Sequence, residues 1–539
     1  MSSSSSAGDH VLSLDVGTTT IKACIFDRSG VVVSRESSPV VTLSPRPGWS
    51  EVEPARLWAD IKAVLVKVVA ASGLPPGAIR CLGLCTMRST FTTWDRKTGR
   101  EFHNFITWKD LRADKLVRRW NRSLTLRGFR ALMKAAHLIT QNKRYLAASI
   151  YTLSNEMTTC RLLWALENVP ALAKATESGD AVFGTLDTWL VHKLTGGGTY
   201  VTEISNASGT GLFDPFTVSW GAFVFKMLGI PMFLAPPVVD SAGAHFGAVS
   251  APDLPLDGAA ISAVLSDQSA SLFGSNCLGR GDAKITLGTG SFLTINTGDT
   301  AHASLGGLVP FVSWRFGTAA AGERFSYNAE GAANNTSTSI AWAGEMGLFG
   351  DPSQSSELVT TAIKDGGGDS DFGLCFVPGF HGLTAPVMDP RAGAGIIGMT
   401  PGTGRTDVLR AVLESVAFTI KQLEDTFERE SDYRLRNIQI DGGVAQNDFV
   451  VQTVATLLGQ DVQRATTKDV GALGVAFLAG LDAGVWRSAD ELAEIRTVQR
   501  TFQPESSESP YVRALRERYR RWCEACRRFS EWHPEEQDT

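Results

Sequence analysis

The sequence predicts an α/β protein with two large domains, each built on a mixed sheet that is flanked by helices. The chain has 539 residues, which is too long for a single hydrophobic core. Near its start, three apolar strand-like runs are followed by a helical pattern and another strand-like run. The second half shows the same succession of strands and then helices. We therefore expect two domains of similar fold, although the sequence shows no repeat.

The first sheet is predicted from short apolar runs separated by turn residues. Strands are expected over residues 11–14, 21–26 and 31–33, and Asp27 to Gly30 supplies a hairpin turn between the last two. A helix is expected over 54–71 and a further strand over 79–85, from their apolar spacing. A hairpin strand is antiparallel to its neighbour, whereas a strand reached through a helix is usually parallel, so the sheet should be mixed. No GxGxxG motif follows the first strand, which disfavours a dinucleotide-binding fold.

The second half supports the division into domains. Strands are expected over 283–287, 292–296, near 308–314 and over 438–440, and helices over 407–428 and 449–458. The boundary between the domains is expected after Gly274. The predicted organisation is a disordered leader over 1–10, an N-terminal domain over 11–274, a C-terminal domain over 275–505 and a C-terminal helix within 506–539.

Composition excludes several classes of partner. The 51 basic and 56 acidic residues give a net charge of −5 without a clustered basic face, which disfavours nucleic acid. No apolar stretch is long enough to span a bilayer, and the polar start of the chain lacks the apolar core of a signal peptide. The eight cysteines lie mostly in apolar runs, which is typical of reduced thiols. We expect a cytoplasmic protein.

Three glycine-containing turns carry the first functional signal. They lie at residues 15–20, 287–291 and 441–445, each after a short aliphatic run. Glycine allows the backbone to approach phosphate oxygens closely, and adjacent N–H groups and threonine hydroxyls can then bind them. One such turn is weak support because Gly-Thr turns are common. Three of them in both halves of the chain suggest a nucleotide held between two domains, and hence phosphoryl transfer.

Charged residues next to these turns fit the same chemistry. Asp15, at the end of a buried strand, would repel phosphate unless Mg²⁺ lay between them, although a turn-capping role is about equally common. Lys22 on the next strand can neutralise a phosphate. Asp267 ends an apolar strand and is the expected general base, with Gln268 bonding a neighbouring substrate hydroxyl; as an isolated feature it is more often a helix cap. Arg88 ends another strand and offers fixed donors to a small polyol.

Other catalytic motifs are absent from the sequence. It contains no Walker sequence, no HRD motif of the protein-kinase type and no GxSxG elbow. The eight histidines show no spacing typical of metal ligands. Among folds that catalyse phosphoryl transfer, these absences favour one that binds ATP with backbone hairpins.

Two amphipathic segments lie outside this machinery. Residues 510–532 carry an apolar stripe, for which packing on its own domain is a commoner explanation than partner binding. Residues 124–146 are locally basic with interleaved apolar residues. A solvated helix face is the commoner explanation for them, and a membrane-surface role is the alternative.

Taken together, the motifs resemble the FGGY family of carbohydrate kinases, most closely its glycerol kinase branch. The resemblance covers about residues 11–502 and is very specific. It rests on segments distributed over both halves, at residues 15–20, 48–51, 184–190, 206–208, 267–270, 288–290, 376–378, 385–390, 394–399, 407–414 and 441–443. The chain is most similar to a divergent animal group of that branch, the glycerol kinase 5 group, with which it shares the stretch 102–106.

The resemblance implies an actin-like ATPase fold of two ribonuclease-H-like domains, with ATP and Mg²⁺ as cofactors. It implies that Asp267 is the general base and that Asp15 faces Mg²⁺. By carry-over, the acceptor is bound by Arg88, Ser89, Trp108 and Gln268, with the indole covering the carbon face of the acceptor. The residues implied to contact the nucleotide are Thr18, Thr19, Thr20, Lys22, Thr289, Gly443 and Asn447.

The sequence departs from the glycerol kinase pattern at three places. Ser89 replaces a glutamate, and 155–157 lacks a tyrosine and is followed by Arg161 where a lysine is usual. Ser337 and Ala341 stand where a glycine and a glutamine contact the nucleotide. Loss of the glutamate removes a charged acceptor for substrate hydroxyls, which weakens binding or changes specificity.

The expected function is therefore ATP-dependent phosphorylation of a small polyol, with glycerol as the leading substrate and sn-glycerol 3-phosphate as its product. Another polyol or a ketose is the alternative within the class, and a weakly catalytic ATP-binding regulator is the alternative outside it. The retained Asp15, Arg88, Asp267 and Gln268 favour an active enzyme. The sequence leaves the oligomeric state open, and a homo-oligomer is one of the alternatives.

Overall fold

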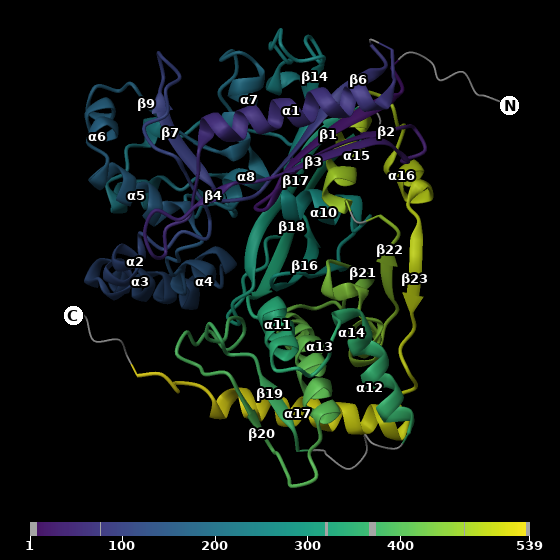
Figure 1. The fold of residues 1–539 in the computed structure, drawn as a ribbon. Coiled ribbons are helices and arrows are strands. Elements are labelled where there is room, and N and C mark those ends of the chain that lie inside the picture. Colours follow the sequence, from purple (N-terminus) through teal and green to yellow (C-terminus); the bar gives the residue numbers. More distant parts are fainter. Residues whose placement is uncertain (1–7, 76, 319–321, 366–372, 468, 535–539) are drawn as a thin grey trace, which may run out of the picture.

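The computed structural model describes residues 8–75, 77–318, 322–365, 373–467 and 469–534. Two mixed sheets dominate it. In Figure 1 the sheet from the start of the chain lies in the upper right of the view and the second sheet lies below it. Residues 1–7 of the expected leader lie outside the described part. The first strand already begins at His10, so the expected leader extends one residue too far.

The first sheet has the strand order β14-β6-β1-β2-β3 and is mixed, as predicted. β1 pairs antiparallel with β2 and parallel with β6, and β14 is parallel to β6. The strands are β1 (His10–Val16), β2 (Thr20–Phe26), β3 (Val32–Pro39), β6 (Ile79–Thr86) and β14 (Ala260–Ser266). The predicted helix is α1 (Pro54–Ser72); it begins with a proline and ends at Gly73, whose left-handed conformation suits glycine.

The second sheet has the strand order β17-β18-β16-β15-β21-β22-β23. Its central strands repeat the first topology: β15 pairs antiparallel with β16 and parallel with β21, and β21 is parallel to β22. The expected likeness of the two domains is thus confirmed. The strands are β15 (Asp282–Leu287), β16 (Ser291–Gly298), β17 (Val309–Thr318), β18 (Gly322–Ala333), β21 (Arg436–Asp441), β22 (Val462–Ala465) and β23 (Val498–Phe502). β18 was not predicted from the sequence.

Two helices join the domains by direct backbone contact. α10 (Asp267–Gly274) follows the first sheet, and α15 (Val470–Asp482) follows β22. A Cβ at Gly474 would lie 1.8 Å from the carbonyl oxygen of Ala270, and one at Gly274 would lie 2.2 Å from that of Val470. Since only glycine avoids these collisions, the two helices approach as closely as their backbones allow. The apolar residues around this contact form one buried cluster that includes strand residues of the first sheet.

The N-terminal part carries additional elements that sequence analysis did not predict as a unit. A second five-stranded sheet has the order β4-β5-β8-β7-β9. Its strands are β4 (Thr42–Leu43), β5 (Glu51–Val52), β7 (Phe91–Asp95), β8 (Phe105–Ile106) and β9 (Ala181–Thr185). The helices of this part are α2 (Asp114–Arg122), α3 (Leu124–Thr140), α4 (Lys143–Ser149), α5 (Thr158–Asn168), α6 (Pro170–Glu177), α7 (Leu186–Leu194), α8 (Ile204–Ser208) and α9 (Ala222–Leu228). Helices α2 to α4 lie at its outer edge, on the lower left of Figure 1.

Most of the remaining helices pack on the second sheet and on one another, whereas one, α16 (Ala489–Ile495), contacts the β2–β3 turn, where Arg28 pairs with Glu491. The others are α11 (Thr336–Glu345), α12 (Ser355–Lys364), α13 (Arg405–Glu430), α14 (Asp448–Leu458) and α17 (Pro510–Arg528). The short strands β19 (Cys375–Val377) and β20 (Gly395–Ile397) pair beside them. The predicted helices over 407–428 and 449–458 correspond to α13 and α14, within two residues at each end.

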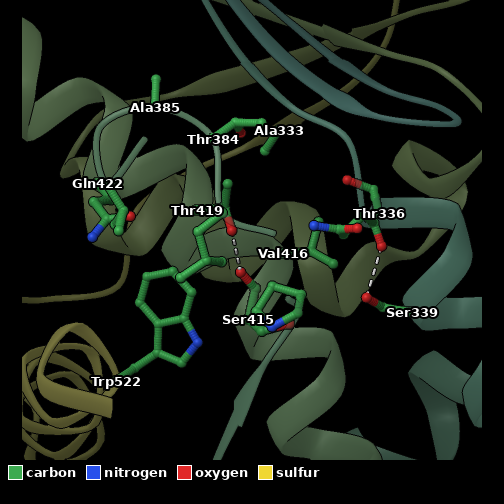
Figure 2. Close-up of a pocket in the computed structure, with 14 residues that line it drawn as sticks. Ala333, Thr336, Ser339, Thr384, Ala385, Ser415, Val416, Thr419, Gln422 and Trp522 are labelled. Carbon is green, nitrogen blue, oxygen red and sulfur yellow. Dashed lines mark hydrogen bonds between the residues drawn. The ribbon is translucent and has the colours of Figure 1, made fainter. Parts of the chain in front are cut away.

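The C-terminal helix α17 packs on its own domain, as the commoner explanation predicted. Its indole Trp522 is buried and donates a hydrogen bond of 2.8 Å to the carbonyl oxygen of Phe376. Trp522 also borders a cavity of about 30 Å³ beside α13 and α11 (Figure 2). That volume holds only about one or two water molecules. It is too small for a nucleotide, and none of the predicted site residues lines it.

Candidate active site

Three predicted site residues come together because three parallel strands end in register. Val16 of β1 pairs with Thr86 of β6, which in turn pairs with Ser266 of β14. The carboxyl ends of adjacent parallel strands meet at one edge of a sheet, where α/β proteins bind ligands. Asp15, Arg88 and Asp267 lie within two residues of these positions, so the sheet gathers them at a single edge.

Arg88 forms the centre of an ion-pair network. Its guanidinium lies 2.5 Å from a carboxylate oxygen of Glu330 and 3.7 Å from one of Asp267. Burial alone would lower the pKa of Arg88, but the charges of Glu330 and Asp267 outweigh it and raise that pKa. Glu330 comes from β18 in the second domain. Arg88 therefore connects the expected base to both domains, and Glu330 is a site residue that the sequence did not reveal.

Asp267 begins helix α10 and stays partly open to solvent. One of its carboxylate oxygens accepts a hydrogen bond of 2.8 Å from the backbone N–H of Gln268, and its side chain is 36 % exposed. Its surroundings remove enough water to raise the pKa of the carboxyl group, against the opposing charge of Arg88. A carboxylate with a raised pKa and access to solvent is suited to accept a proton from a bound hydroxyl.

Gln268 has an unused acceptor beside this base. Its Oε1 atom is buried and has no hydrogen-bond partner among the described residues. An orphaned buried acceptor costs free energy unless a ligand satisfies it. A substrate hydroxyl could donate to this oxygen, which fits the expected role of Gln268.

Asp15 lies opposite Lys22 in the β1–β2 hairpin, whose turn is the first glycine turn. Burial raises the pKa of Asp15 to about 6, although Lys22 opposes the change. The charges of Asp267 and Asp469 contribute to this rise. Among the described residues there is no cluster of three or more side chains that would hold a metal on its own. The half-buried carboxylate of Asp15 is nevertheless suited to Mg²⁺, which takes one or two carboxylates together with waters and phosphate oxygens.

The first glycine turn is connected to the expected aromatic residue. The indole Nε1 of Trp108 donates a hydrogen bond of 2.9 Å to the hydroxyl of Thr18, whereas Thr19 is exposed and Thr20 half-buried. Trp108 and the turn therefore lie side by side. This arrangement suits an acceptor held at Trp108 next to phosphates held at the turn.

Lys22 is engaged by the second domain. Its ammonium group lies 3.3 Å from a carboxylate oxygen of Asp469, which also pairs with Arg35 at 3.1 Å. Asp469 immediately precedes α15. Binding of a phosphate by Lys22 would compete with the Lys22–Asp469 pair, which no local sequence pattern indicates.

The two glycine turns of the second domain lie side by side. Thr286 of β15 pairs with Asp441 of β21, so the following glycine turns are adjacent. Gly442 has a φ of 101°, and a Cβ there would lie 2.3 Å from the carbonyl oxygen of Leu287. Only glycine permits this approach. Thr289 and Gly443 are exposed at the tips of these turns.

Three polar residues near these turns are held by hydrogen bonds or an ion pair. The side chain of Asn447 accepts a hydrogen bond from the N–H of Val450 at the start of α14 and donates one to Ser355. Ser337 donates to the carbonyl oxygen of Thr289 through both its N–H and its hydroxyl. The buried Lys284 pairs with Asp441 at 3.1 Å. The pairing of Lys284 was not foreseen, because a lysine in a strand gives no sign of burial.

Ser89 points into the protein. It has a φ of 60°, and its hydroxyl donates a hydrogen bond of 2.6 Å to the carbonyl oxygen of Gly209. Arg161 is fully buried and donates to the carbonyl oxygens of Ser89 and Thr107, at 2.8 and 2.5 Å. Burial lowers the pKa of Arg161 to about 9. Arg161 thus holds together the backbones that carry Ser89 and Trp108.

No helix in the described ranges is both long and apolar enough to cross a bilayer.

Family models match both domains. The FGGY family of carbohydrate kinases, N-terminal domain, matches residues 10–274, and the C-terminal domain of the same family matches residues 283–483. Among curated proteins, Glycerol kinase 5 of Danio rerio is 41 % identical over 527 residues, covering 97 % of each chain. Glycerol kinase 5 of Homo sapiens is 39 % identical over 525 residues, covering 97 % of this chain and 96 % of its own.

A solved structure agrees with these matches. The crystal structure of Plasmodium falciparum glycerol kinase with ADP superimposes with a TM-score of 0.85 at 26 % sequence identity. The superposition covers 96 % of this chain and 98 % of that one. The two-domain architecture is therefore that of a kinase whose structure contains bound ADP.

Proposed function

The chain belongs to the FGGY family of carbohydrate kinases, with the actin-like ATPase fold of that family, and we propose that it phosphorylates glycerol to sn-glycerol 3-phosphate with ATP. The observation that carries the proposal is the placement of Asp267 beside Arg88 and Gln268 at the edge where three parallel strands end. The relatives named above as glycerol kinases favour glycerol as the acceptor. Residues 11–274 would bind the acceptor, and residues 275–505 would bind the nucleotide.

In this proposal Asp267 is the general base. Its carboxylate accepts the proton of the attacking hydroxyl, whose oxygen forms a bond to the γ-phosphorus while the bond to the β–γ bridging oxygen breaks and ADP leaves. Arg88 and Gln268 orient the acceptor, since the guanidinium donates to hydroxyl oxygens and Oε1 accepts from a hydroxyl. Trp108 covers the carbon atoms, and the backbone at Ser89 closes the same side.

The residues around the glycine turns would hold ATP and its cation. Thr18, Thr19, Thr20 and Lys22 would bind phosphates from the first domain, and Thr289, Gly443 and Asn447 would bind the nucleotide from the second. Asp15 would hold Mg²⁺, which supplies neutralising charge at the phosphate oxygens when bound. Binding of Lys22 to phosphate would break its ion pair with Asp469, which would keep its pair with Arg35.

ADP release with Mg-ATP tests the proposal, measured across glycerol, longer polyols and ketoses. Glycerol-dependent release with a kcat/KM above that of every other acceptor supports it. Release that depends on another compound would keep the mechanism and replace the substrate. Clear ATP binding without release for any acceptor would contradict an enzyme and favour the regulator.

Ser89→Ala distinguishes two roles of this position. The hydroxyl bonds the carbonyl oxygen of Gly209, so its removal should lower the free energy of unfolding by about 1 kcal/mol. We expect the KM for glycerol to change by less than about two-fold, because the backbone at Ser89 remains in place. Steady-state kinetics and urea denaturation measure both effects. A large rise in KM without loss of stability would mean that the hydroxyl itself binds the acceptor.

Activity should fall in acid. Asp267 must be ionised to accept a proton, and burial raises its pKa. Protonation of this carboxylate therefore removes activity. We expect kcat/KM for the acceptor to begin to decline at a pH above the ordinary carboxyl range of about 4. A profile that stays flat down to about that pH would contradict the raised pKa of Asp267.

A further inference from the structure

Helix α3 (Leu124–Thr140) presents an apolar face to solvent. Leu124 and Ile139 are 85 % and 83 % exposed, and Leu138 and Leu132 are 66 % and 64 % exposed. Leu126 is the buried residue of this helix. Single exposed leucines are ordinary, but four large apolar side chains on one 17-residue helix form a patch of the kind that marks an interaction surface.

The exposed residues share one side of α3. Positions 124, 131, 135 and 138 recur at intervals of three, four or seven residues, with 132 and 139 directly beside them, and all six are exposed. These intervals place side chains on a single helix face. The opposite side, with Phe129 and Met133, is turned inward and is only partly exposed. The helix therefore has one apolar face toward the protein and another toward solvent.

The inward side of α3 packs on α9, which exposes a further apolar side chain. Phe129 stacks on Phe223 of α9, with ring centroids 4.7 Å apart, and the Phe223 side chain is 52 % exposed. In Figure 1 α3 lies at the outer edge of the N-terminal part, beside α2 and α4 and away from the two central sheets. An apolar partner could thus reach this surface without touching the candidate active site.

The surroundings of the patch are cationic. No aspartate or glutamate occurs from Lys115 to Asn155, a stretch that carries nine lysines and arginines, in a chain whose net charge is −5. Some of these cations are paired, such as Arg144 with Asp214. The ion pairs among the described residues do not include Arg127, Lys134 or Lys143. Arg127 and Lys134 lie along one edge of the exposed apolar face.

We propose that α3 docks the protein on the surface of an anionic membrane. The helix would lie in the plane of the interface, with Leu132, Leu138 and Ile139 among the acyl chains and Arg127 and Lys134 at the headgroups. A basic helix with an outward apolar face is the arrangement that binds such interfaces. A symmetric contact between two copies of α3 is disfavoured, because it would bring their unpaired cations together.

Sedimentation of the full-length protein with vesicles tests the proposal. We expect binding to vesicles of phosphatidylcholine with phosphatidylserine, little binding to phosphatidylcholine alone, and weaker binding at high salt. Arg127→Gln with Lys134→Gln should weaken binding by about 30-fold, from two lost cations. Leu138→Glu with Ile139→Glu should abolish binding. ADP release in solution should stay at the wild-type level for both pairs.

A matched control replaces exposed apolar residues elsewhere. Leu305 and Met346 are 65 % and 63 % exposed and lie outside α3. Leu305→Glu with Met346→Glu should bind vesicles as the wild type does. A Leu138→Trp variant measures insertion directly, because brominated lipids should quench the fluorescence of the added indole. This measurement does not depend on the glutamate variants, so it remains decisive if they fold poorly.

Three outcomes would overturn the proposal. One is equal sedimentation of wild type and the Leu138→Glu, Ile139→Glu variant. Another is equal binding to neutral and anionic vesicles. The third is a wild type that ignores vesicles but forms dimers that the same variant disrupts, which would make the α3 face an interface between copies.

Discussion

Asp267→Asn is expected to lower kcat by about 10²–10⁴-fold, the range of a lost general base, while the affinity for Mg-ATP stays unchanged. Asparagine keeps the shape of the side chain, and its oxygen can still accept the hydrogen bond from the N–H of Gln268. It cannot accept a proton from the attacking hydroxyl. Stopped-flow or steady-state ADP release measures kcat, and calorimetric titration measures nucleotide affinity.

Glu330→Gln is the matched control, because it also removes one negative charge beside Arg88. Glu330 orients Arg88 and has no proton to accept in the proposed reaction. Its replacement should raise the KM for the acceptor more than it lowers kcat. Equal losses of kcat in the two variants would mean that Asp267 acts through Arg88 and is not the base.

Glu414→Ala should lower the free energy of unfolding by about 3–5 kcal/mol, the cost of breaking a buried ion pair. Glu414 on α13 lies 2.9 Å from both Arg410 and Arg518, the latter on α17. Burial would raise the pKa of Glu414, but the two guanidinium groups outweigh it and lower that pKa. Its removal leaves two cations buried without their shared carboxylate. Urea denaturation is the measurement, analysed for the first transition because a two-domain chain need not unfold in one step.

Glu517→Ala provides the comparison for this effect. Glu517 also lies on α17 and pairs with Arg520 and Arg521, but its side chain is 36 % exposed. A surface pair of this kind contributes at most about 1 kcal/mol. If both alanine variants shift the urea midpoint equally, Glu414 does not anchor α17 to its domain.

Three of the predicted site residues lie next to strand ends. Asp15, Arg88 and Asp267 each follow or end a run of apolar residues, and parallel strands bring such ends to one edge. This part of the site needs only local patterns and one topological rule. Apolar periodicity predicted the helices α1, α13 and α14 to within two residues of their observed ends.

Glu330 was not predicted as a site residue because its strand, β18, was not predicted. Residues 328–333 of β18 read Asn-Ala-Glu-Gly-Ala-Ala, and these residue types are depleted in strands. β18 is held by pairing on both sides, with β16 and β17. Tertiary pairing overrides local propensity there, and the approach of the second domain then brings Glu330 to Arg88. The pairing of Lys22 with Asp469 has the same origin, since no local pattern encodes a contact between domains.

Transfer of the labelled γ-phosphate of ATP shows directly whether a polyol hydroxyl accepts the phosphoryl group. The wild-type protein is incubated with labelled Mg-ATP and glycerol, and the labelled products are separated and identified. We expect label on sn-glycerol 3-phosphate, with Asp267→Asn forming it at least about 10²-fold more slowly. Label found only in inorganic phosphate, or retained in ATP that the protein demonstrably binds, would contradict transfer to a polyol hydroxyl.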